Sequence, residues 1–188
     1  MIRAILLTVA LLAASIASAP PGNADSFDVL WDLMPWGYDQ KECTRVPNDV
    51  LPASALEPGA LAKFHCPDTP EAGAPPIPEG MYVLFADRRS LADEFKWNVD
   101  YDSTHGGLAP CPGGLPSPGP WHHPESPTVV AGQLACVDDP DEVTLSWTRD
   151  DDLLAGTIWG PAGSLPQLYD WWTYNGGAGR NATSPPTP

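Results

Sequence analysis

Four cysteines are the residues of this 188-residue chain whose chemistry follows most directly from their spacing. Cys43 and Cys66 are 23 positions apart, and Cys111 and Cys136 are 25 positions apart. Four cysteines allow three pairings, and a weak internal repeat favours Cys43–Cys66 together with Cys111–Cys136. Each disulfide would close a loop of roughly 25 residues and stabilise the fold by about 3 kcal/mol. A zinc site is the alternative, but the sequence has no Cys-x-x-Cys pair.

Acidic side chains occur in two clusters and in one stretch where oxygen-bearing residues alternate. They are Asp138–Glu142, Asp150–Asp152 and the stretch Asn98-x-Asp100-x-Asp102-x-Thr104. Several carboxylates on flexible loops suit calcium, although the stretch lacks the glycine and the glutamate of an EF-hand. Asp and Asn are also common in turns and helix caps for local reasons. Solvated turns are therefore the main interpretation, calcium binding is the alternative, and no metal ligand is assigned.

Eight tryptophans could supply flat faces that stack on sugar rings. So many indoles are hard to bury in a small domain, although packing in the core accounts for most of them. Four are candidates for an exposed face: Trp36, Trp121, Trp159 and Trp171. We predict that a cleft lined by tryptophan and acidic side chains binds a ligand, with Trp121, Trp171, His122 and His123 as its contact residues. Adjacent histidines on a strand point to opposite faces, so joint metal ligation by His122 and His123 is not expected.

Catalytic motifs are missing from the sequence. It has no Gly-x-Ser-x-Gly elbow, no phosphate-binding loop and no dinucleotide fingerprint. A pair of carboxylates could serve glycoside hydrolysis. With 24 acidic residues, however, some pair will lie near any cleft. No catalytic residue and no cofactor is predicted.

The charge and composition of the chain limit its partners. Nine Lys and Arg stand against 24 Asp and Glu, giving a formal net charge of −15. Nucleic acids and anionic membrane surfaces are bound by clustered basic residues, so neither is predicted as a partner. The chain has 24 prolines and 17 glycines, which suggest long loops, but its eight tryptophans predict a folded core.

Residues 1–24 have the pattern of a cleavable export signal. Arg3 precedes the apolar run Ala4–Ala14, which is too short to span a bilayer, and small residues lead to a predicted cleavage after Ala24. We expect a single disulfide-stabilised domain over residues 25–174 and a flexible proline-rich tail over residues 175–188. No second apolar stretch is long enough to span a membrane. The protein is therefore expected to be secreted, extracellular or associated with the cell envelope, where disulfides persist.

The remaining elements follow from apolar spacing and capping residues. Helices are predicted from a cap at Asp25 or Ser26 to a stop at Pro35 and Gly37, over residues 88–97 after a cap at Asp87, and over residues 165–174. Strands are predicted over residues 59–66, 81–86, 132–137 and 143–148, with a strand or a short helix and strand over 153–159, and a long loop over 98–127. The fold class is α+β, with an antiparallel sheet of four to six strands, two or three short helices and two disulfides. Cys66 and Cys136 each end a strand that begins with Gly-x-Leu, so an internal duplication is one interpretation and chance similarity is the other.

Six short elements give the chain a resemblance to a known group of proteins. They are Tyr82-Val-Leu-Phe-Ala-Asp87, Pro110-Cys111-Pro-Gly113, Gly119-Pro-Trp121, Gly132-x-x-x-Cys136, Ser146-Trp-Thr148 and Leu168-Tyr-x-Trp-Trp172. Their order over roughly residues 60–172 is similar to that in uncharacterised exported mycobacterial and related actinobacterial proteins. Some of these are extracellular segments attached to bacterial serine/threonine kinases. The resemblance implies an exported domain without an established activity, so no functional residue is carried over from it.

Together these observations predict a secreted, non-catalytic binding or interaction domain at the cell envelope or outside the cell. Its expected partner is an envelope glycan, a lipid or a protein. A hydrolase acting on a cell-wall glycan is the alternative. An enzyme requires two carboxylates that face each other across a cleft, at least one with a displaced pKa, whereas a binding domain exposes aromatic rings without such a pair. A secreted structural protein would show neither feature.

Overall fold

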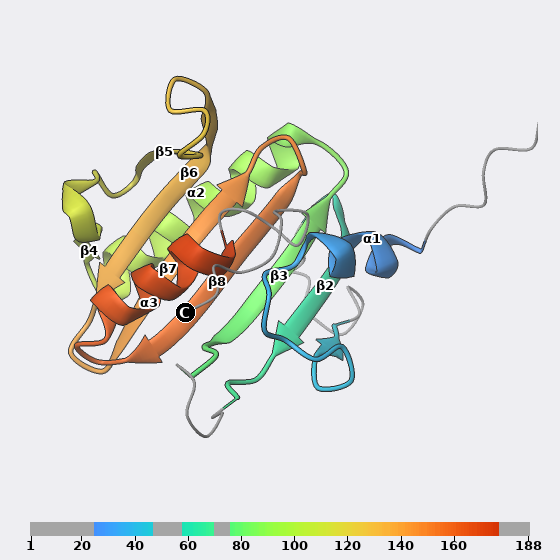
Figure 1. Cartoon of the computed structure of the whole chain (residues 1–188). Coiled ribbons are helices and arrows are strands. Elements are labelled where there is room, and N and C mark those ends of the chain that lie inside the picture. The colour runs from blue at the N-terminus through green and yellow to red at the C-terminus, as the bar shows by residue number, and fades with distance from the viewer. Residues whose placement is uncertain (1–24, 47–57, 70–75, 177–188) are drawn as a thin grey trace, which may run out of the picture.

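The computed structural model describes residues 25–46, 58–69 and 76–176 (Figure 1). The predicted signal peptide, residues 1–24, lies outside these ranges, as does all of the predicted tail except its first two residues. The described helices are α1 (Ser26–Leu33), α2 (Arg88–His105) and α3 (Leu165–Trp171). The described strands are β1 (Thr44–Arg45), β2 (Ala60–Cys66), β3 (Glu79–Phe85), β4 (Leu108–Ala109), β5 (Gly119–His122), β6 (Val130–Asp138), β7 (Glu142–Arg149) and β8 (Leu154–Pro161).

The strands form one antiparallel sheet, which confirms the predicted α+β class. Their order is β1-β2-β3-β8-β7-β6-β4, and β5 also pairs with β6. The expected count of four to six strands was too low, because the described sheet has eight. The additional strands are the two-residue β1 and β4 and the four-residue β5. Each is paired to a longer neighbour, and such short segments have too few residues to show an alternating pattern in the sequence.

Both predicted disulfides are confirmed. Cys43 precedes β1 and is bonded to Cys66 at the end of β2, while Cys111 follows β4 and is bonded to Cys136 in β6. The two bonds therefore lie toward opposite edges of the sheet, where the strands are shortest. Each bond ties an edge segment to a longer strand.

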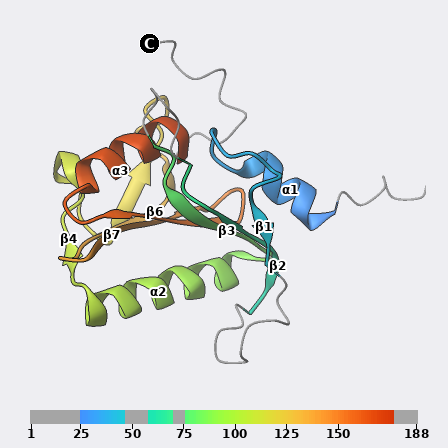
Figure 2. The same cartoon turned by 90° about the horizontal axis from the view of Figure 1, so that it is seen from below.

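The two faces of the sheet differ in polarity. Helices α1 and α3 cover one face and α2 covers the other (Figure 2). Side chains alternate between the faces along each strand, so Val143, Leu145 and Trp147 of β7 join the main core under α1 and α3. Gly156 of the neighbouring strand β8 makes room for this indole, because a Cβ there would lie 2.4 Å from the Trp147 ring.

Beneath α2 the same strand presents hydroxyl groups, those of Thr144, Ser146 and Thr148. All three side chains are buried. The apolar cluster on this face is small, with only Val83, Phe85, Leu91 and Ala155 fully buried in it. The α2 face of the sheet therefore places buried hydroxyl groups among apolar side chains, while the opposite face holds the main core.

Helix α1 forms for local reasons that the sequence shows. The side chain of Asp25 caps its first turn by accepting a hydrogen bond from the backbone N–H of Phe27 at 3.2 Å. Leu30 is buried on the core face, and the helix ends before Pro35. This agrees with the cap and the end predicted for this segment.

Helix α2 is longer than predicted. Asp87 caps it as expected, accepting hydrogen bonds from the backbone N–H groups of Arg89 and Ser90, both at 2.9 Å. The predicted loop over residues 98–127 was wrong in its first part, because the helix continues to His105. It was also wrong at residues 108–109 and 119–122, which form β4 and β5. Past Phe95 the helix buries no apolar side chain, so its second half gives no periodic signal in the sequence.

The two predicted halves correspond only as far as their hairpins. Strands β2 and β6 each carry one cysteine of a disulfide and each pairs with the next long strand, β3 or β7. After β3 the chain enters α2, whereas after β7 it continues into β8. Leu91, the leucine that follows β3, therefore lies on a helix, whereas Leu153, the leucine that follows β7, precedes a strand. The internal duplication stays a prediction.

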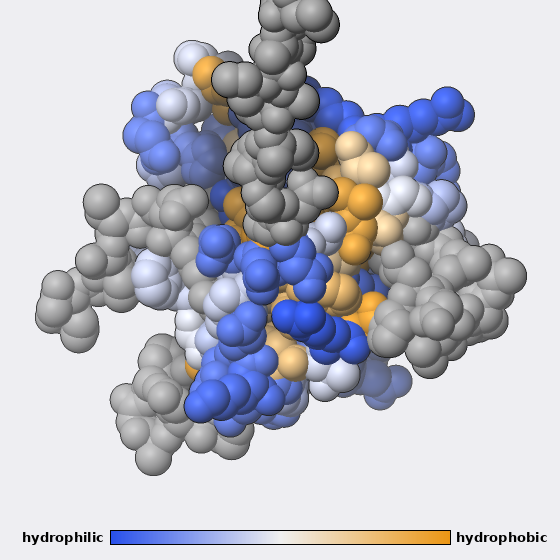
Figure 3. All heavy atoms as spheres, turned by 90° about the vertical axis from the view of Figure 1, so that its right-hand side faces the viewer, coloured by the Kyte–Doolittle hydropathy of each residue, from blue (hydrophilic) through white to orange (hydrophobic). Residues whose placement is uncertain are grey.

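The outer surface of the described residues is mainly hydrophilic on the side of α1 and β2, with an apolar patch among the polar groups (Figure 3). Val29 of α1 and Leu61 of β2 are both exposed. Over the described ranges, no helix combines the length and the apolar character needed to cross a membrane.

Candidate functional site

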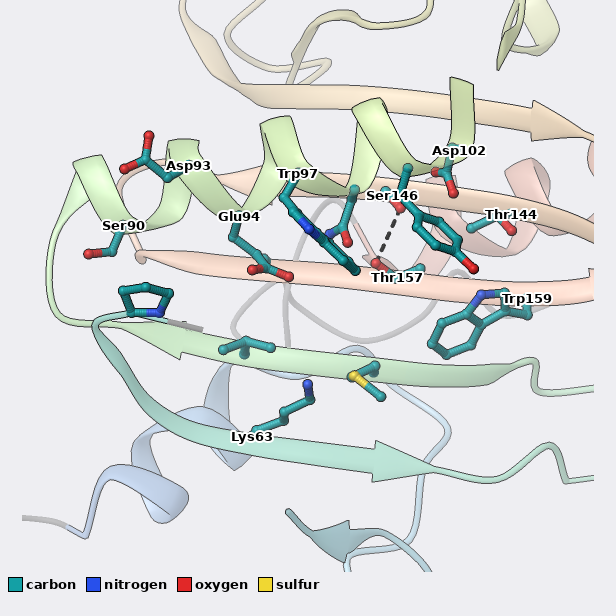
Figure 4. A pocket seen from close by; sticks show the side chains of 16 residues that line it. Lys63, Ser90, Asp93, Glu94, Trp97, Asp102, Thr144, Ser146, Thr157 and Trp159 are labelled. Atoms are coloured by element: carbon teal, nitrogen blue, oxygen red, sulfur yellow. Dashed lines mark hydrogen bonds between the residues drawn. The ribbon is translucent and has the colours of Figure 1, made fainter. Parts of the chain in front are cut away.

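A cavity lies between α2 and the face of the sheet that bears the buried hydroxyl groups (Figure 4). Its volume is about 440 Å³, within the size range of small-molecule binding sites. Helix α2 forms one wall, and residues of β2, β3, β7 and β8 form the other. We call this cavity the α2 cleft.

The floor of the α2 cleft carries neutral hydroxyl groups. Thr144 and Ser146 of β7 and Thr157 of β8 line it. Ser146 is paired with Thr157 in the register of the two strands, and their hydroxyl oxygens are 3.2 Å apart. Met81 of β3 and Ala155 of β8 supply apolar surface beside these hydroxyls. The floor can therefore give and accept hydrogen bonds next to patches that favour hydrocarbon.

Aromatic rings stand on both walls of the cleft. Trp97 and Tyr101 project from successive turns of α2, and Trp159 comes from β8. Trp97 is 55% exposed and Tyr101 is 50% exposed. Their rings are stacked, with centroids 5.5 Å apart and an interplanar angle of 21°. Figure 4 shows the Trp97 indole pointing from the helix toward the strands, on the same side as Glu94.

Charged groups in the cleft are divided between its walls. Asp93, Glu94 and Asp102 all belong to α2, whereas Lys63 belongs to β2. The Lys63 side chain points toward the helix and is only 5% exposed (Figure 4). Because three acids face one base, the described lining carries a net negative charge at neutral pH.

The ionisation of Asp102 is altered by its place in the cleft. Partial burial raises the pKa of its carboxyl from 3.8 to about 6, against a smaller opposing effect of the nearby His105. A carboxyl with this pKa is ionised at neutral pH and becomes a hydrogen-bond donor in mildly acidic solution.

Pairs of carboxylates of the kind used by glycoside hydrolases do not face each other across the described lining. Every acidic residue of the cleft comes from the helix, and the strand residues that line it bear no carboxylate. Another acid of the sheet, Glu142, also has a raised pKa. Burial is the main cause, followed by the charges of Glu79 and Asp139. Glu79 and Glu142 are at the ends of β3 and β7 and do not line the cleft.

The four residues predicted to contact a ligand do not line the α2 cleft. Trp121 is 4% exposed, and its indole Nε1 donates a hydrogen bond of 2.8 Å to the carbonyl oxygen of Thr148. The expectation that Trp121 presents an open face is therefore corrected: its ring packs in the main core because β5 adds to the edge of β6. Trp171 is half-buried against the same core, with its ring 5.8 Å from that of Tyr38.

The two predicted histidines lie beside Trp121, away from the cleft. His122 is exposed on β5. His123 is half-buried with its ring 4.9 Å from that of Trp121, and it lines a smaller cavity of about 190 Å³ together with Arg149. The structure thus brings Trp121 and His123 together, but Trp121 belongs to the main core, on the opposite face of the sheet from the rings of α2. Of the four tryptophans considered for stacking, Trp159 is the one that lines the α2 cleft.

Sequence reasoning missed most of the cleft, although two signals for it were present. Trp97, Tyr101 and His105 are spaced four residues apart, and the last two rings also stack, at 4.1 Å. This spacing predicts a row of rings on one helix face. In addition, every second residue of β7 from Thr144 to Thr148 bears a hydroxyl, which predicts a polar face behind an apolar one.

The calcium alternative loses its geometric basis. Asn98, Asp100, Asp102 and Thr104 lie within α2 and not on a flexible loop: Asn98 and Asp102 line the cleft, whereas Asp100 and Thr104 are exposed on another side of the helix. Across residues 25–46, 58–69 and 76–176, no group of three or more His, Cys, Asp or Glu side chains is arranged to hold a metal ion.

No family model, curated protein or solved structure matches this chain. The chemistry of the site therefore rests on its own geometry, which is that of a hydroxyl-floored cleft flanked by exposed aromatic rings.

Proposed function

We propose that this protein is a secreted, non-catalytic binding domain whose ligand occupies the α2 cleft. The observation that supports this most directly is the polarity of the sheet beneath α2. A sheet face covered by a helix is normally apolar, because burying hydroxyl groups without good partners costs free energy. Here Thr144 and Ser146 are buried at the floor of a cavity that the helix leaves open. A ligand with polar groups could bond to the Thr144 hydroxyl and to the Ser146 hydroxyl, which already shares a hydrogen bond with Thr157.

The exposed aromatic rings support the same proposal. Large aromatic side chains contribute most to stability when they are buried, yet Trp97 and Tyr101 each leave half of their surface in solvent. Both rings flank the cleft, so the exposed face of Trp97 and the exposed edge of Tyr101, which is stacked on Trp97 and His105, are available to a bound molecule. Binding would bury surface that the fold itself leaves uncovered.

A binding role fits the cleft better than the alternative of a cell-wall hydrolase. Hydrolysis of a glycosidic bond uses two carboxyl groups placed on either side of the bond. The acids that line the α2 cleft share one wall. Secretion is consistent with the two disulfides and with the export pattern of residues 1–24.

The first experiment is a screen of the oxidised protein by thermal unfolding against calcium, zinc, envelope glycans, lipids and peptides. A ligand of the native state raises the Tm by mass action. We expect one class to raise it, and we expect Trp97→Ala to abolish the rise. Trp36→Ala is the matched control, because Trp36 is also an exposed indole, at 38%, and does not line the cleft. If no class raises the Tm, or if Trp36→Ala has the same effect as Trp97→Ala, the proposal is wrong.

A further inference from the structure

We propose that the ligand of the α2 cleft is a neutral carbohydrate, a short glycan held between aromatic rings and the hydroxyl floor. This inference rests on the proposed binding function and adds the class of ligand. It follows from three properties of the cleft taken together: the position of its rings, the kind of polar group on its floor and the sign of its charges.

The rings are placed for stacking on sugars. One face of a pyranose ring bears mostly C–H groups, which pack on the flat face of an indole or a phenol. Tyr101 is stacked on both Trp97 and His105, so the flat face that the helix offers is that of Trp97, and Trp159 offers another from β8 on the opposite wall. Since Trp97 and Tyr101 stack on each other, they restrict each other's rotation, which lowers the entropy lost when a ligand binds.

The polar groups match the hydroxyl groups of a sugar. A sugar hydroxyl both donates and accepts hydrogen bonds, so it pairs well with side chains that can do the same. Thr144, Ser146 and Thr157 have this property. Asn98 adds an amide that donates and accepts. A polyhydroxylated ligand can bond to several of these groups at once.

Other small ligands fit the cleft less well. An acyl chain would cover the floor hydroxyls with hydrocarbon, so that they lose contact with solvent and gain no new hydrogen bond, which costs free energy. An anion would meet Asp93, Glu94 and Asp102. A quaternary ammonium would suit the rings and acids, but the buried Lys63 amine places a like charge on the opposite wall. A neutral molecule avoids both kinds of repulsion.

The test measures binding of the full chain to a printed array of neutral mono- and oligosaccharides. It also measures binding to phosphatidylcholine vesicles as a lipid probe. Any sugar that binds is then titrated in solution while the indole N–H signals of the tryptophans are followed by NMR. We expect a sugar to shift the signals of Trp97 and Trp159 while that of the buried Trp147 stays in place.

Variants of the floor distinguish a sugar from an apolar ligand. Ser146→Ala combined with Thr157→Val removes two facing hydroxyls and nearly conserves their volume, so neither group is left without a partner. We expect this double variant to bind the sugar roughly tenfold more weakly, while an acyl ligand would bind it equally well or better. Thr173→Val is the control, since it removes an exposed hydroxyl of the segment after α3.

The possible results separate the two proposals. Sugar binding that shifts the Trp97 and Trp159 signals and weakens in the double variant supports both. If vesicles or another screened ligand shift these signals and no sugar does, the carbohydrate assignment is wrong while the cleft remains a binding site. Sugar binding that the double variant does not weaken also overturns the assignment. If nothing tested shifts either signal, both proposals fail.

Discussion

Asp102 illustrates how one residue of the cleft is placed at a cost to the fold. Its carboxyl is partly buried in the last turn of α2, where the partial negative charge of the helix end disfavours an anion. Burial raises its pKa to about 6, which means that the folded protein holds this proton more tightly than the unfolded chain does. Residues kept at such positions are candidates for contact with a ligand.

The stability of the protein should therefore depend on pH through Asp102. Because the pKa is about 6 in the folded state and near 3.8 in the unfolded state, the favourable contribution of the proton is complete below pH 3.8 and is lost as the pH rises through 6. Asp102→Asn, which stays neutral, should raise the free energy of unfolding by about 1 kcal/mol at pH 7.5. The gain is reduced because solvent screens a half-buried carboxylate.

The measurement is urea unfolding of both proteins between pH 4 and pH 7.5. The difference between Asp102→Asn and the natural protein should grow with pH over this range. Asp100→Asn is the control, since Asp100 is an exposed residue of the same helix. A difference that is constant with pH would contradict the argument.

At the scale of elements, α2 is held to the sheet at one end more firmly than at the other. Its buried residues, Leu91 and Phe95, are both in its first half. The α2 cleft runs along both halves, from Ser90 to Asp102, and the second half buries no apolar side chain. This unequal attachment gives one helix two roles, as a packed element and as the wall of a site.

Amide hydrogen exchange should reveal this difference within α2. Backbone N–H groups near Phe95 should exchange slowly, and those from Tyr101 to His105 should exchange about tenfold faster or more, because local opening of the second half exposes little apolar surface. A ligand in the α2 cleft should slow the faster set. Uniform protection along the helix would show that the second half is anchored by contacts other than the apolar ones.

The elements that the sequence predicts well are those with a local cause. The Asp25 and Asp87 caps and the apolar alternation of β7 each belong to a few neighbouring residues. The second half of α2 has no apolar stripe, and β5 pairs only because β6 presents an edge to it. The α2 cleft is harder still, since it brings Trp97 and Trp159 together from elements 62 positions apart in the chain. A loop over residues 98–127 would leave Trp121 open to a ligand, whereas pairing of β5 with β6 places its ring in the core.

At the scale of the whole molecule, the disulfides secure the two margins of the sheet. The Cys43–Cys66 and Cys111–Cys136 bonds span 23 and 25 residues. Replacing both members of either pair with alanine should lower the free energy of unfolding by about 3 kcal/mol, because each bond restricts the unfolded chain by a similar amount. Urea unfolding monitored by circular dichroism measures this change. Reduction of the natural protein is the control for the small cavities that alanine leaves.

The expected result is a similar loss for either bond and a larger loss when both are removed. A loss below about 1 kcal/mol for one pair would mean that its edge is already fixed by packing and that the bond adds little to the constraint on the unfolded chain.

The strand order has a consequence for the time course of folding. Strand β8, Leu154–Pro161, lies at the centre of the sheet, between β3 and β7, although it is the last described strand in the chain. Until β8 arrives, the β1–β3 and β4–β7 segments each present an open edge, and within the described sheet no strand pairing joins them. Pairing over such long sequence distances is slow compared with local hairpin formation. A chain emerging from the ribosome therefore cannot complete its core before residue 161 is free.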